Sequence, residues 1–384
     1  MNFTLTQSIK VFEQNGAITQ IGELMREAGF HKAFLVCDAG IVKLGVAEKI
    51  QNILAAEGLE CVLFDKVLPD PPAEIVDEGA ALCKAEACDC VIAVGGGSSI
   101  DTGKGINILR FNEGKILDYA MPGSIKVPAR GLICIPTTSG TGSELSNGLI
   151  ISDVKNEVKV PILAVEGMSE YALLDPELTV GMPAGLTMVT GLDVFSHACE
   201  AYSSILGNAM TDAICEKIMA DVVEFLPRVV ADGKDILARE RMLGAASLGG
   251  WMLACASAHV GHSIAHVLGA KFHIPHGKAC AYSLPAVFEL LTEQCPDKNR
   301  RVGEILGVEF DAEESTESIM EKTSQAYRKF CAELGLEAIP VACPSETEMD
   351  ALVDAVVNEP LGGVSPVKAT PENIRPLLKK LFTA

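Results

Sequence analysis

Short runs of apolar and β-branched residues recur in the first part of this 384-residue chain and stop near residue 182. Before that point they alternate with stretches of helical periodicity, which is the βαβ pattern of a parallel sheet. After it, the pattern indicates helices alone. Because a chain of this length exceeds what one core usually supports, we predict two domains. They are an N-terminal α/β domain with a parallel sheet over residues 1–181 and a C-terminal all-helical domain over residues 182–384.

The elements within these domains follow from the same patterns. Strands are predicted at 33–37, 60–64, 90–94, 131–136 and 171–176, with a helix at 73–87. The helices of the second domain are predicted at 187–205, 209–227, 236–257, 259–270, 281–294, 297–305, 313–335, 346–357 and 371–381, with a loop at 358–370. These helices are predicted to be punctuated by Pro183, Pro227, Pro275, Pro285 and Pro296.

Composition excludes several classes of partner. The net charge is −20 and no long basic run is present, which disfavours binding to nucleic acid or anionic membranes. No apolar run approaches the length of a membrane span, and the polar first residues do not resemble a signal peptide. The thirteen cysteines are scattered and odd in number, so we expect free thiols in a reducing cytoplasm.

Four of the seven histidines, together with one aspartate, show spacings that suit a metal ion. Two pairs are four residues apart, and residues i and i+4 share one face of a helix. One carboxylate with neutral imidazoles suits Fe²⁺ or Zn²⁺. Each residue alone has a simpler explanation, since Asp193 could cap a helix that begins near Gly191. The residues are Asp193 with His197, His262 with His266, and His276 in a Pro-His-Gly turn.

A glycine-rich segment follows the strand predicted at 90–94. Residues 95–101 read Gly-Gly-Gly-Ser-Ser-Ile-Asp and open a helix. Glycines let the backbone approach an anion closely, and a helix N-terminus offers free N–H groups. We therefore predict that this loop binds a phosphate. The alternative is a tight turn in which Ser98 caps the helix.

Two further polar features follow other predicted strands. The loop at 136–144 carries hydroxyls that could contact a nucleotide, although a Ser/Thr-rich loop without function would be equally hydrophilic. Ligands of open α/β sheets bind at the carboxyl ends of the strands, where both loops are expected. Asp38 ends another strand, where it could accept hydrogen bonds from an adenosine ribose and repel a 2′-phosphate. That position favours NAD over NADP.

Taken together, these segments resemble the iron-containing (group III) alcohol dehydrogenase family over nearly the whole chain. The strongest matches are residues 190–202 and 262–270, and the segments 95–101, 136–144, 174–179 and 275–277 complete the set. The resemblance implies a dehydroquinate-synthase-like fold, with an N-terminal nucleotide-binding domain and a C-terminal helical, metal-binding and catalytic domain. It also implies a homodimer or larger homo-oligomer.

The resemblance also implies site residues. Metal ligands are expected at Asp193, His197, His262 and His276, and His266 is expected beside the metal as a catalytic residue rather than a required ligand. The extra His259 departs from the family pattern, and we interpret it as a helix-surface residue, with pocket shaping as the alternative. Contacts to NAD are expected from Asp38, Gly95, Gly96, Gly97, Ser98, Asp101, Thr137, Thr138, Thr141, Ser143, Ser146, Lys159 and Leu186.

The activity expected from this resemblance is a metal-dependent, NAD(H)-linked interconversion of a short-chain primary alcohol, diol or hydroxy acid with its aldehyde. Fe²⁺ is the expected ion and Zn²⁺ is possible. Alternatives of the same fold are a glycerol-dehydrogenase-like zinc enzyme, a metal-free maleylacetate reductase and a dehydroquinate-synthase-like lyase. The lyase would need several basic residues near the metal, and residues 187–277 offer few. A non-catalytic metal- and NAD-binding assembly protein is a remote alternative.

Overall fold

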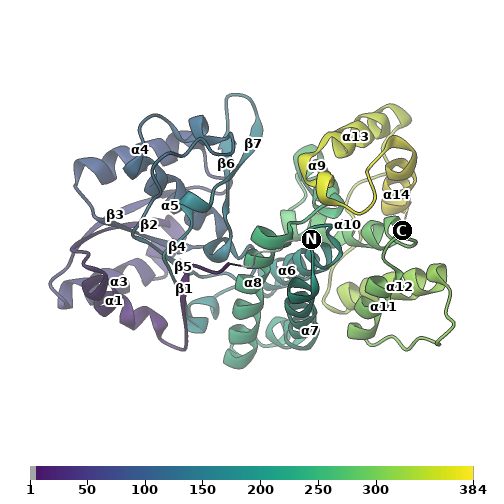
Figure 1. Cartoon of the computed structure of the whole chain (residues 1–384). Helices are drawn as coiled ribbons and strands as arrows, with labels where there is room; N and C mark the ends of the chain where they lie inside the picture. Colours follow the sequence, from purple (N-terminus) through teal and green to yellow (C-terminus); the bar gives the residue numbers. More distant parts are fainter. Residues whose placement is uncertain (1–5, 384) are drawn as a thin grey trace. The chain divides into compact units, whose positions relative to one another are not determined.

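The computed structural model describes residues 6–383 (Figure 1). The chain separates into two compact units, with the division between Gly181 and Met182. Within the described range, every strand lies in the first unit and the second contains helices only. The predicted fold class, a parallel-sheet α/β domain followed by an all-helical domain, is therefore confirmed.

The first unit is built on a six-stranded sheet in the order β1-β8-β5-β4-β2-β3. All neighbouring strands in it are parallel. The five strands predicted from the sequence form its centre and one edge. The strands are β1 (Lys10–Glu13), β2 (Lys32–Asp38), β3 (Glu60–Val67), β4 (Cys90–Gly95), β5 (Leu132–Pro136) and β8 (Tyr171–Leu174).

Three strands were not predicted. β1 is a four-residue edge strand whose side chains are largely exposed, so it carries no apolar run. β6 (Gly148–Asp153) and β7 (Val158–Leu163) form an antiparallel hairpin. Pro161 interrupts the pattern of β7, and a two-stranded ribbon tolerates proline because its outer edge needs no donor. These strands depend on pairing partners that the sequence pattern does not reveal.

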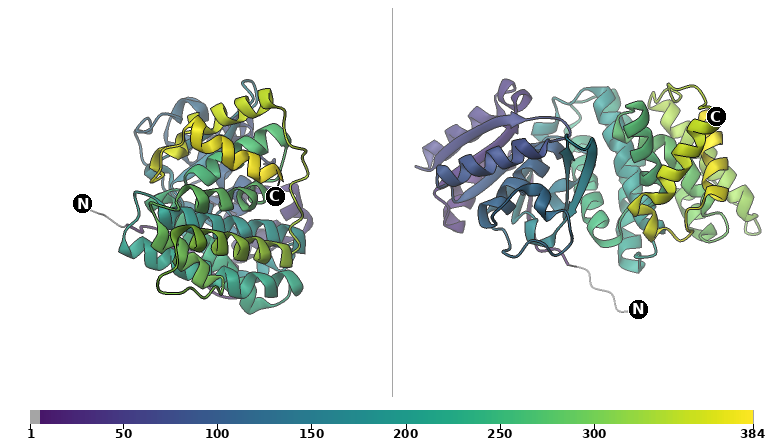
Figure 2. Two further views of the ribbon diagram at one scale, coloured as in Figure 1. Left: turned by 90° about the vertical axis from the view of Figure 1, so that its right-hand side faces the viewer. Right: turned by 90° about the horizontal axis from the view of Figure 1, so that it is seen from above.

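Helices of the first unit cover both faces of the sheet (Figures 1 and 2). They are α1 (Ile21–Ala28), α2 (Ala39–Lys43), α3 (Val46–Ala56), α4 (Ala73–Ala85) and α5 (Gly97–Phe111). Short 3₁₀ helices are η1 (Ala17–Gln20), η2 (Ile116–Tyr119), η3 (Ser143–Leu145), η4 (Val165–Gly167) and η5 (Pro176–Thr179).

The alternation of side chains along β2 shows how the faces are filled. Phe34 and Val36 belong to the core that also contains residues of α4 and α5. Leu35 and Cys37 belong to the core on the opposite face, with residues of α1 and α3. Since successive side chains of a strand point to opposite faces, a strand covered on both sides must be apolar throughout. That is why the central strands were recognisable as continuous apolar runs.

The second unit is a helical bundle around α6, in which every residue from 191 to 203 is buried. Helices α13 and α14, at the end of the chain, pack beside α9 and α10 (Figure 2). The helices are α6 (Ala184–Ser203), α7 (Ala209–Ala231), α8 (Ile236–Ala256), α9 (Val260–Phe272), α10 (His276–Leu290), α11 (Pro296–Ile305), α12 (Thr316–Glu333), α13 (Glu346–Asn358), η6 (Pro360–Val364) and α14 (Pro371–Thr383).

Two of the prolines predicted to punctuate the helices do not interrupt them. Pro227 lies inside α7 and Pro285 inside α10. A proline removes one helical hydrogen bond, but the apolar face continues past it in both helices. Leu226 and Val229 lie in the core of the second unit, as does Leu284. Packing of that continuous face outweighs the local cost of the proline.

Two expectations from composition can be compared with the fold. None of the thirteen cysteines, all in the described part of the chain, forms a disulfide, as expected for free thiols. From Thr6 to Thr383, no single helix is long and apolar enough to cross a membrane. The pair α8 and α9 passes that test only when taken together, bent by 110°.

Candidate functional site

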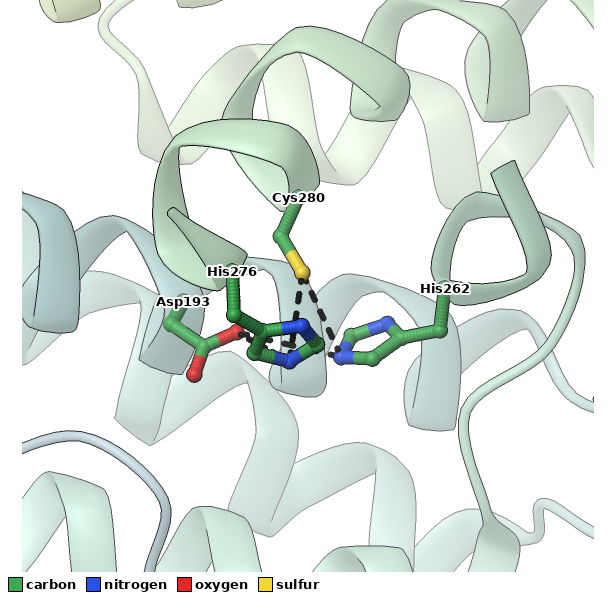
Figure 3. A group of neighbouring side chains, drawn as sticks. All are labelled: Asp193, His262, His276 and Cys280. Atoms are coloured by element: carbon green, nitrogen blue, oxygen red, sulfur yellow. Dashed lines mark hydrogen bonds and ion pairs between the residues drawn. The ribbon is translucent and has the colours of Figure 1, made fainter. Parts of the chain in front are cut away.

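Three helices of the second unit bring four potential metal ligands together (Figure 3). Asp193 comes from α6, His262 from α9, and His276 and Cys280 from α10. One ligand atom of each lies within 4.8 Å of all the others. Asp193 Oδ1 is 3.8 Å from His262 Nε2 and 3.6 Å from His276 Nε2. The structure thus groups three of the predicted ligands with a thiol that was not predicted.

His197 lies beside this group rather than within it. Its Nε2 atom is 3.5 Å from Asp193 Oδ1, and its ring stacks on that of His262 with centroids 4.9 Å apart. Burial lowers the pKa of His197, so its ring is neutral at pH 7. A neutral imidazole retains the lone pair that a metal ion needs.

Asp193 does not cap a helix. α6 begins at Ala184, after Pro183, which places Asp193 within the helix and makes the capping alternative wrong. Its side chain is buried, and Oδ1 has no hydrogen-bond partner among the residues described. Burial acts to raise the pKa of Asp193, but the surrounding histidines outweigh it and lower the pKa. A buried, ionised oxygen beside the neutral rings of His197 and His276, whose pKa values burial lowers, fits a cation, which would supply the missing partner.

Gly277 explains why a Pro-His-Gly turn places His276 here. A Cβ atom on Gly277 would lie 2.1 Å from the backbone oxygen of Val189 in α6. Only glycine lets the first turn of α10 approach α6 this closely. The approach brings His276 to Asp193.

Replacing Gly277 with alanine is expected to destabilise the protein by about 1–3 kcal/mol, since overpacking forces backbone shifts. In an ordinary helix the same change would stabilise by up to about 1 kcal/mol. Denaturant unfolding measures the difference. Gly185→Ala in α6 is the control, because a Cβ there meets nothing within 4 Å. Equal effects of the two substitutions would contradict the assigned role of Gly277.

Glu200, on α6, fixes the orientation of His262. Its Oε1 atom is 2.5 Å from His262 Nδ1. Its Oε2 atom accepts hydrogen bonds from the backbone N–H groups of His259, Gly261 and His262 at 2.8, 3.0 and 3.2 Å. A carboxylate at Nδ1 requires the proton to sit there, which leaves Nε2 to face Asp193. This role was not predicted, although a glutamate within an apolar helix was a visible signal.

His259 is not on a helix surface, so that interpretation is wrong. Its side chain is fully buried at the start of α9. Nε2 is 2.9 Å from Ser203 Oγ and Nδ1 is 3.5 Å from Glu200 Oε2. The backbone N–H bond to Glu200 draws the residue inward and explains the burial. His259 therefore packs behind His262 rather than facing solvent.

His266 lies one turn beyond His262 on α9, with its side chain 40% exposed. Its ring stacks on that of His276 with centroids 5.5 Å apart. Nδ1 is 2.9 Å from Glu359 Oε1. Glu359 Oε2 in turn accepts from Ser263 Oγ and from the backbone N–H of Leu361, both at 2.8 Å. The C-terminal segment therefore supplies an acidic partner for His266 that was not predicted.

In the first unit, the two predicted nucleotide loops start side by side, because Gly95 pairs with Pro136 at the ends of β4 and β5. Gly95 has φ +142°, a conformation that favours glycine. A Cβ on Gly97 would lie 2.8 Å from Thr141, and one on Gly96 would lie 3.3 Å from Thr138. The glycines thus let the two loops pack closely.

The helix after the glycine loop has no side-chain cap. α5 begins at Gly97 with Gly96 as its N-cap, and no side-chain hydrogen bond caps it in the described structure. Ser98 lies within the first turn, so the alternative in which it caps the helix is wrong. An uncapped N-terminus next to glycines keeps its N–H groups available for an anion.

Three other predicted contact residues are occupied by bonds within the protein. Ser143 Oγ donates to Asp101 Oδ1 at 2.5 Å, and the Ile150 backbone N–H donates to Oδ2 at 2.9 Å. The buried Lys104 Nζ donates to the backbone oxygen of Ser146 at 2.9 Å. These bonds fasten the loop at 136–146 to α5. Asp101, Ser143 and Ser146 therefore stabilise the loop conformation through hydrogen bonds within the protein.

The remaining predicted contacts are Asp38, Thr137, Lys159 and Leu186. Asp38 is the N-cap of α2, and its Oδ1 atom accepts from the N–H groups of Gly40 and Ile41 at 2.6 and 3.1 Å. Lys159 forms an exposed ion pair with Asp70 at 2.6 Å. Thr137 is buried directly after β5, and Leu186, in the first turn of α6, is 42% exposed.

The chain was compared with known families. Residues 8–176 match the model of the iron-containing alcohol dehydrogenase family, and residues 187–382 match the C-terminal model of the Fe-containing alcohol dehydrogenase family. The two matches together span most of the chain.

Comparisons with individual proteins point to the same family. Alcohol dehydrogenase 4 of Schizosaccharomyces pombe is 34% identical over 95% of this chain and 85% of its own length. The NAD-dependent methanol dehydrogenase of Bacillus methanolicus is 36% identical over 76% of this chain and 77% of its own. The crystal structure of a 1,3-propanediol oxidoreductase superposes over 100% of both chains with a TM-score of 0.92 and 31% identity. The chain belongs to the iron-containing alcohol dehydrogenase family.

Proposed function

We propose that this protein is a metal-dependent, NAD(H)-linked alcohol dehydrogenase that interconverts a short-chain primary alcohol, diol or hydroxy acid with its aldehyde. The observation that carries the proposal is the buried Asp193 oxygen, which lies without a hydrogen bond among neutral imidazole nitrogens. The names of its relatives, an alcohol dehydrogenase and an NAD-dependent methanol dehydrogenase, support the same reaction class.

In this proposal the helical unit holds Fe²⁺, with Zn²⁺ as the alternative, through Asp193, His197, His262 and His276. A divalent ion there supplies Lewis acidity that polarises the substrate oxygen and lowers the pKa of a hydroxyl. Glu200 keeps His262 in the tautomer whose Nε2 can bind the ion.

The proton of the alcohol leaves through His266. Its Nδ1 is hydrogen-bonded to Glu359, whose pKa is lowered by His266 and Ser263 despite burial, which acts to raise it. An ionised carboxylate at Nδ1 favours the imidazolium that forms when Nε2 takes up a proton. NAD⁺ bound by the α/β unit would supply the acceptor for the hydride, so that the substrate, having lost one hydride and one proton, becomes an aldehyde.

The α/β unit is proposed to bind the dinucleotide. The uncapped N-terminus of α5 and the glycines before it suit the pyrophosphate. Asp38 ends a neighbouring strand, and its Oδ2 atom remains for a ribose hydroxyl while Oδ1 caps α2. The free cysteines suit a reducing cytoplasm, and a homodimer or larger homo-oligomer is proposed from the family resemblance.

Replacing Asp38 with asparagine is expected to raise the kcat/KM ratio of NADPH over NADH by about tenfold, which corresponds to about 1.4 kcal/mol. The reason is that the negative charge that repels a 2′-phosphate is removed. Asparagine caps helices as well as aspartate does, so α2 should persist. Steady-state kinetics with both cofactors measure the ratio. An unchanged ratio would mean that Asp38 does not contact the ribose.

Replacing Glu359 with glutamine is expected to slow turnover by about ten- to a hundredfold, because a neutral amide stabilises the imidazolium of His266 less well. Metal content should not change. The pH profile of kcat should change. Ser263→Ala is the control, since it removes another bond to Glu359 and keeps the His266 pair. An unaltered pH profile in Glu359→Gln would remove His266 from the proton path.

The proposal as a whole is tested by NADH oxidation with a panel of C2–C4 aldehydes. The protein is assayed after metal removal and after anaerobic loading with Fe²⁺ or Zn²⁺. Activity that appears only with metal is the expected result, and the best aldehyde identifies the substrate class. Tight NADH binding without turnover of any aldehyde would contradict the dehydrogenase reaction and favour a lyase of the same fold.

A further inference from the structure

The side chain of Cys280 has no role in the reaction proposed above, yet it lies within the group of candidate ligands (Figure 3). Its sulfur is 3.7 Å from His262 Nε2 and 3.6 Å from His276 Nε2. The side chain is buried, with only 1% of the residue exposed. We propose that the Cys280 sulfur is a direct ligand of the metal ion and biases the centre toward thiophilic ions such as Zn²⁺ and Co²⁺.

The distances carry this inference. A tetrahedral zinc site has Zn–S bonds of about 2.3 Å and Zn–N bonds of about 2.0–2.1 Å, so its sulfur and nitrogen atoms lie about 3.6 Å apart. The two sulfur–nitrogen separations at Cys280 match that edge length. The separations of Asp193 Oδ1 from the same two nitrogens, 3.8 and 3.6 Å, are similar. One ion can therefore contact these four donors with small adjustments, and His197 Nε2, 3.5 Å from Asp193 Oδ1, is close enough to join them as a fifth donor.

The orientation of Asp193 provides a second, independent observation about the space between the four donors. Asp193 Oδ1 is buried and has no hydrogen-bond partner in the described range of the chain. It is directed at the group that includes Cys280 (Figure 3). His197 also lies near this oxygen but outside the group of four. The thiol is thus more central to the donors than one of the histidines expected to bind metal.

The bonding change is simple. The S–H bond of Cys280 breaks, its proton passes to solvent, and the sulfur electron pair forms a bond to the metal ion, with no oxidation or reduction. A metal-bound thiol is deprotonated outright. Thiolate ligands favour Zn²⁺, whereas a site of carboxylate and imidazole alone suits Fe²⁺ equally well. Selectivity between these ions is therefore set in part by this one side chain.

This inference rests on the metal centre of the proposed function. Co²⁺ binding tests the Cys280 ligand separately from the metal-dependent activity. Metal-free protein is reloaded anaerobically with one equivalent of Co²⁺, and its bound metal is counted. An ultraviolet thiolate-to-cobalt charge-transfer band is expected in the unmodified protein and in Cys215→Ser. Cys215 is a matched control, because it is a buried helix cysteine of the same core. In Cys280→Ser the band should be lost while Co²⁺ remains bound.

X-ray absorption of the Zn²⁺-loaded, unmodified protein provides a second test that needs no variant. One sulfur neighbour at about 2.3 Å is expected beside nitrogen and oxygen neighbours. A shell of nitrogen and oxygen alone, or a cobalt band that survives in Cys280→Ser, overturns the inference but leaves the metal-dependent dehydrogenase intact. Failure of the unmodified protein to bind either ion overturns both the role of Cys280 and the proposed metal-dependent function.

Discussion

Alanine in place of His262 is expected to leave the protein without its bound metal and to lower kcat/KM by at least about a thousandfold. His262 contributes a nitrogen to the group around Asp193 and stacks on His197. Its loss removes one donor and loosens the packing that orients a second. Lewis-acid catalysis contributes several kcal/mol, and each 1.36 kcal/mol corresponds to a factor of ten in rate.

The measurements are metal content after dialysis, kcat/KM with the best aldehyde, and far-ultraviolet circular dichroism. His31→Ala is the control, because the side chain of His31 is 84% exposed and lies in the other unit. Its metal content and rate should not change. A His262→Ala protein that keeps stoichiometric metal and normal activity would show that the ion, if any, binds elsewhere.

The parts of the fold that could be predicted are those with a local physical signal. The central strands β2, β4 and β5 are buried on both faces, so their residues form uninterrupted apolar runs. β1 and β7 could not be predicted from an apolar run, because their side chains are largely exposed. β1 also depends on pairing with β8, which is distant in the sequence, and β6 was missed although Leu149 and Ile151 are buried. The same limit applies to Pro227, where tertiary packing overrides the local preference.

The candidate site also contains residues that could be predicted from the sequence and residues that could not. The pairs Asp193 with His197 and His262 with His266 follow from helical spacing alone. Cys280 was missed because α10 begins at His276 rather than at 281, which puts Cys280 four residues along the same face. The partners of the two α9 histidines were missed because Glu200 is 62 residues from His262 and Glu359 is 93 residues from His266.

Glu200 is expected to produce the second large effect, on stability in acid. Its side chain is fully buried, which acts to raise its pKa, but His262, His259 and the backbone N–H bonds outweigh burial and lower the pKa from 4.5 to about 2. A folded-state pKa below the unfolded value means that the unfolded chain binds the proton first. The stabilisation is therefore complete above pH 4.5 and is lost as the pH falls from there toward 2.

Replacing Glu200 with glutamine is accordingly expected to lower the free energy of unfolding at pH 7 by about 3 kcal/mol, the free energy that corresponds to this change in pKa. The same variant should lose the part of the dependence of stability on pH between about 4.5 and 2 that Glu200 contributes, because an amide does not titrate. Metal affinity should fall by about ten- to a hundredfold, since His262 is no longer held in its binding tautomer.

Denaturant unfolding of the metal-free protein at several pH values measures the loss of stability and its pH dependence separately from the change in metal affinity. Glu333→Gln, at an exposed position of α12 where the carboxylate pairs with Lys329, should change stability by less than about 0.5 kcal/mol. If Glu200→Gln matched that control at pH 7, the carboxylate would not be the element that fixes His262, and the orientation of the metal-facing nitrogen would have to come from packing against His197.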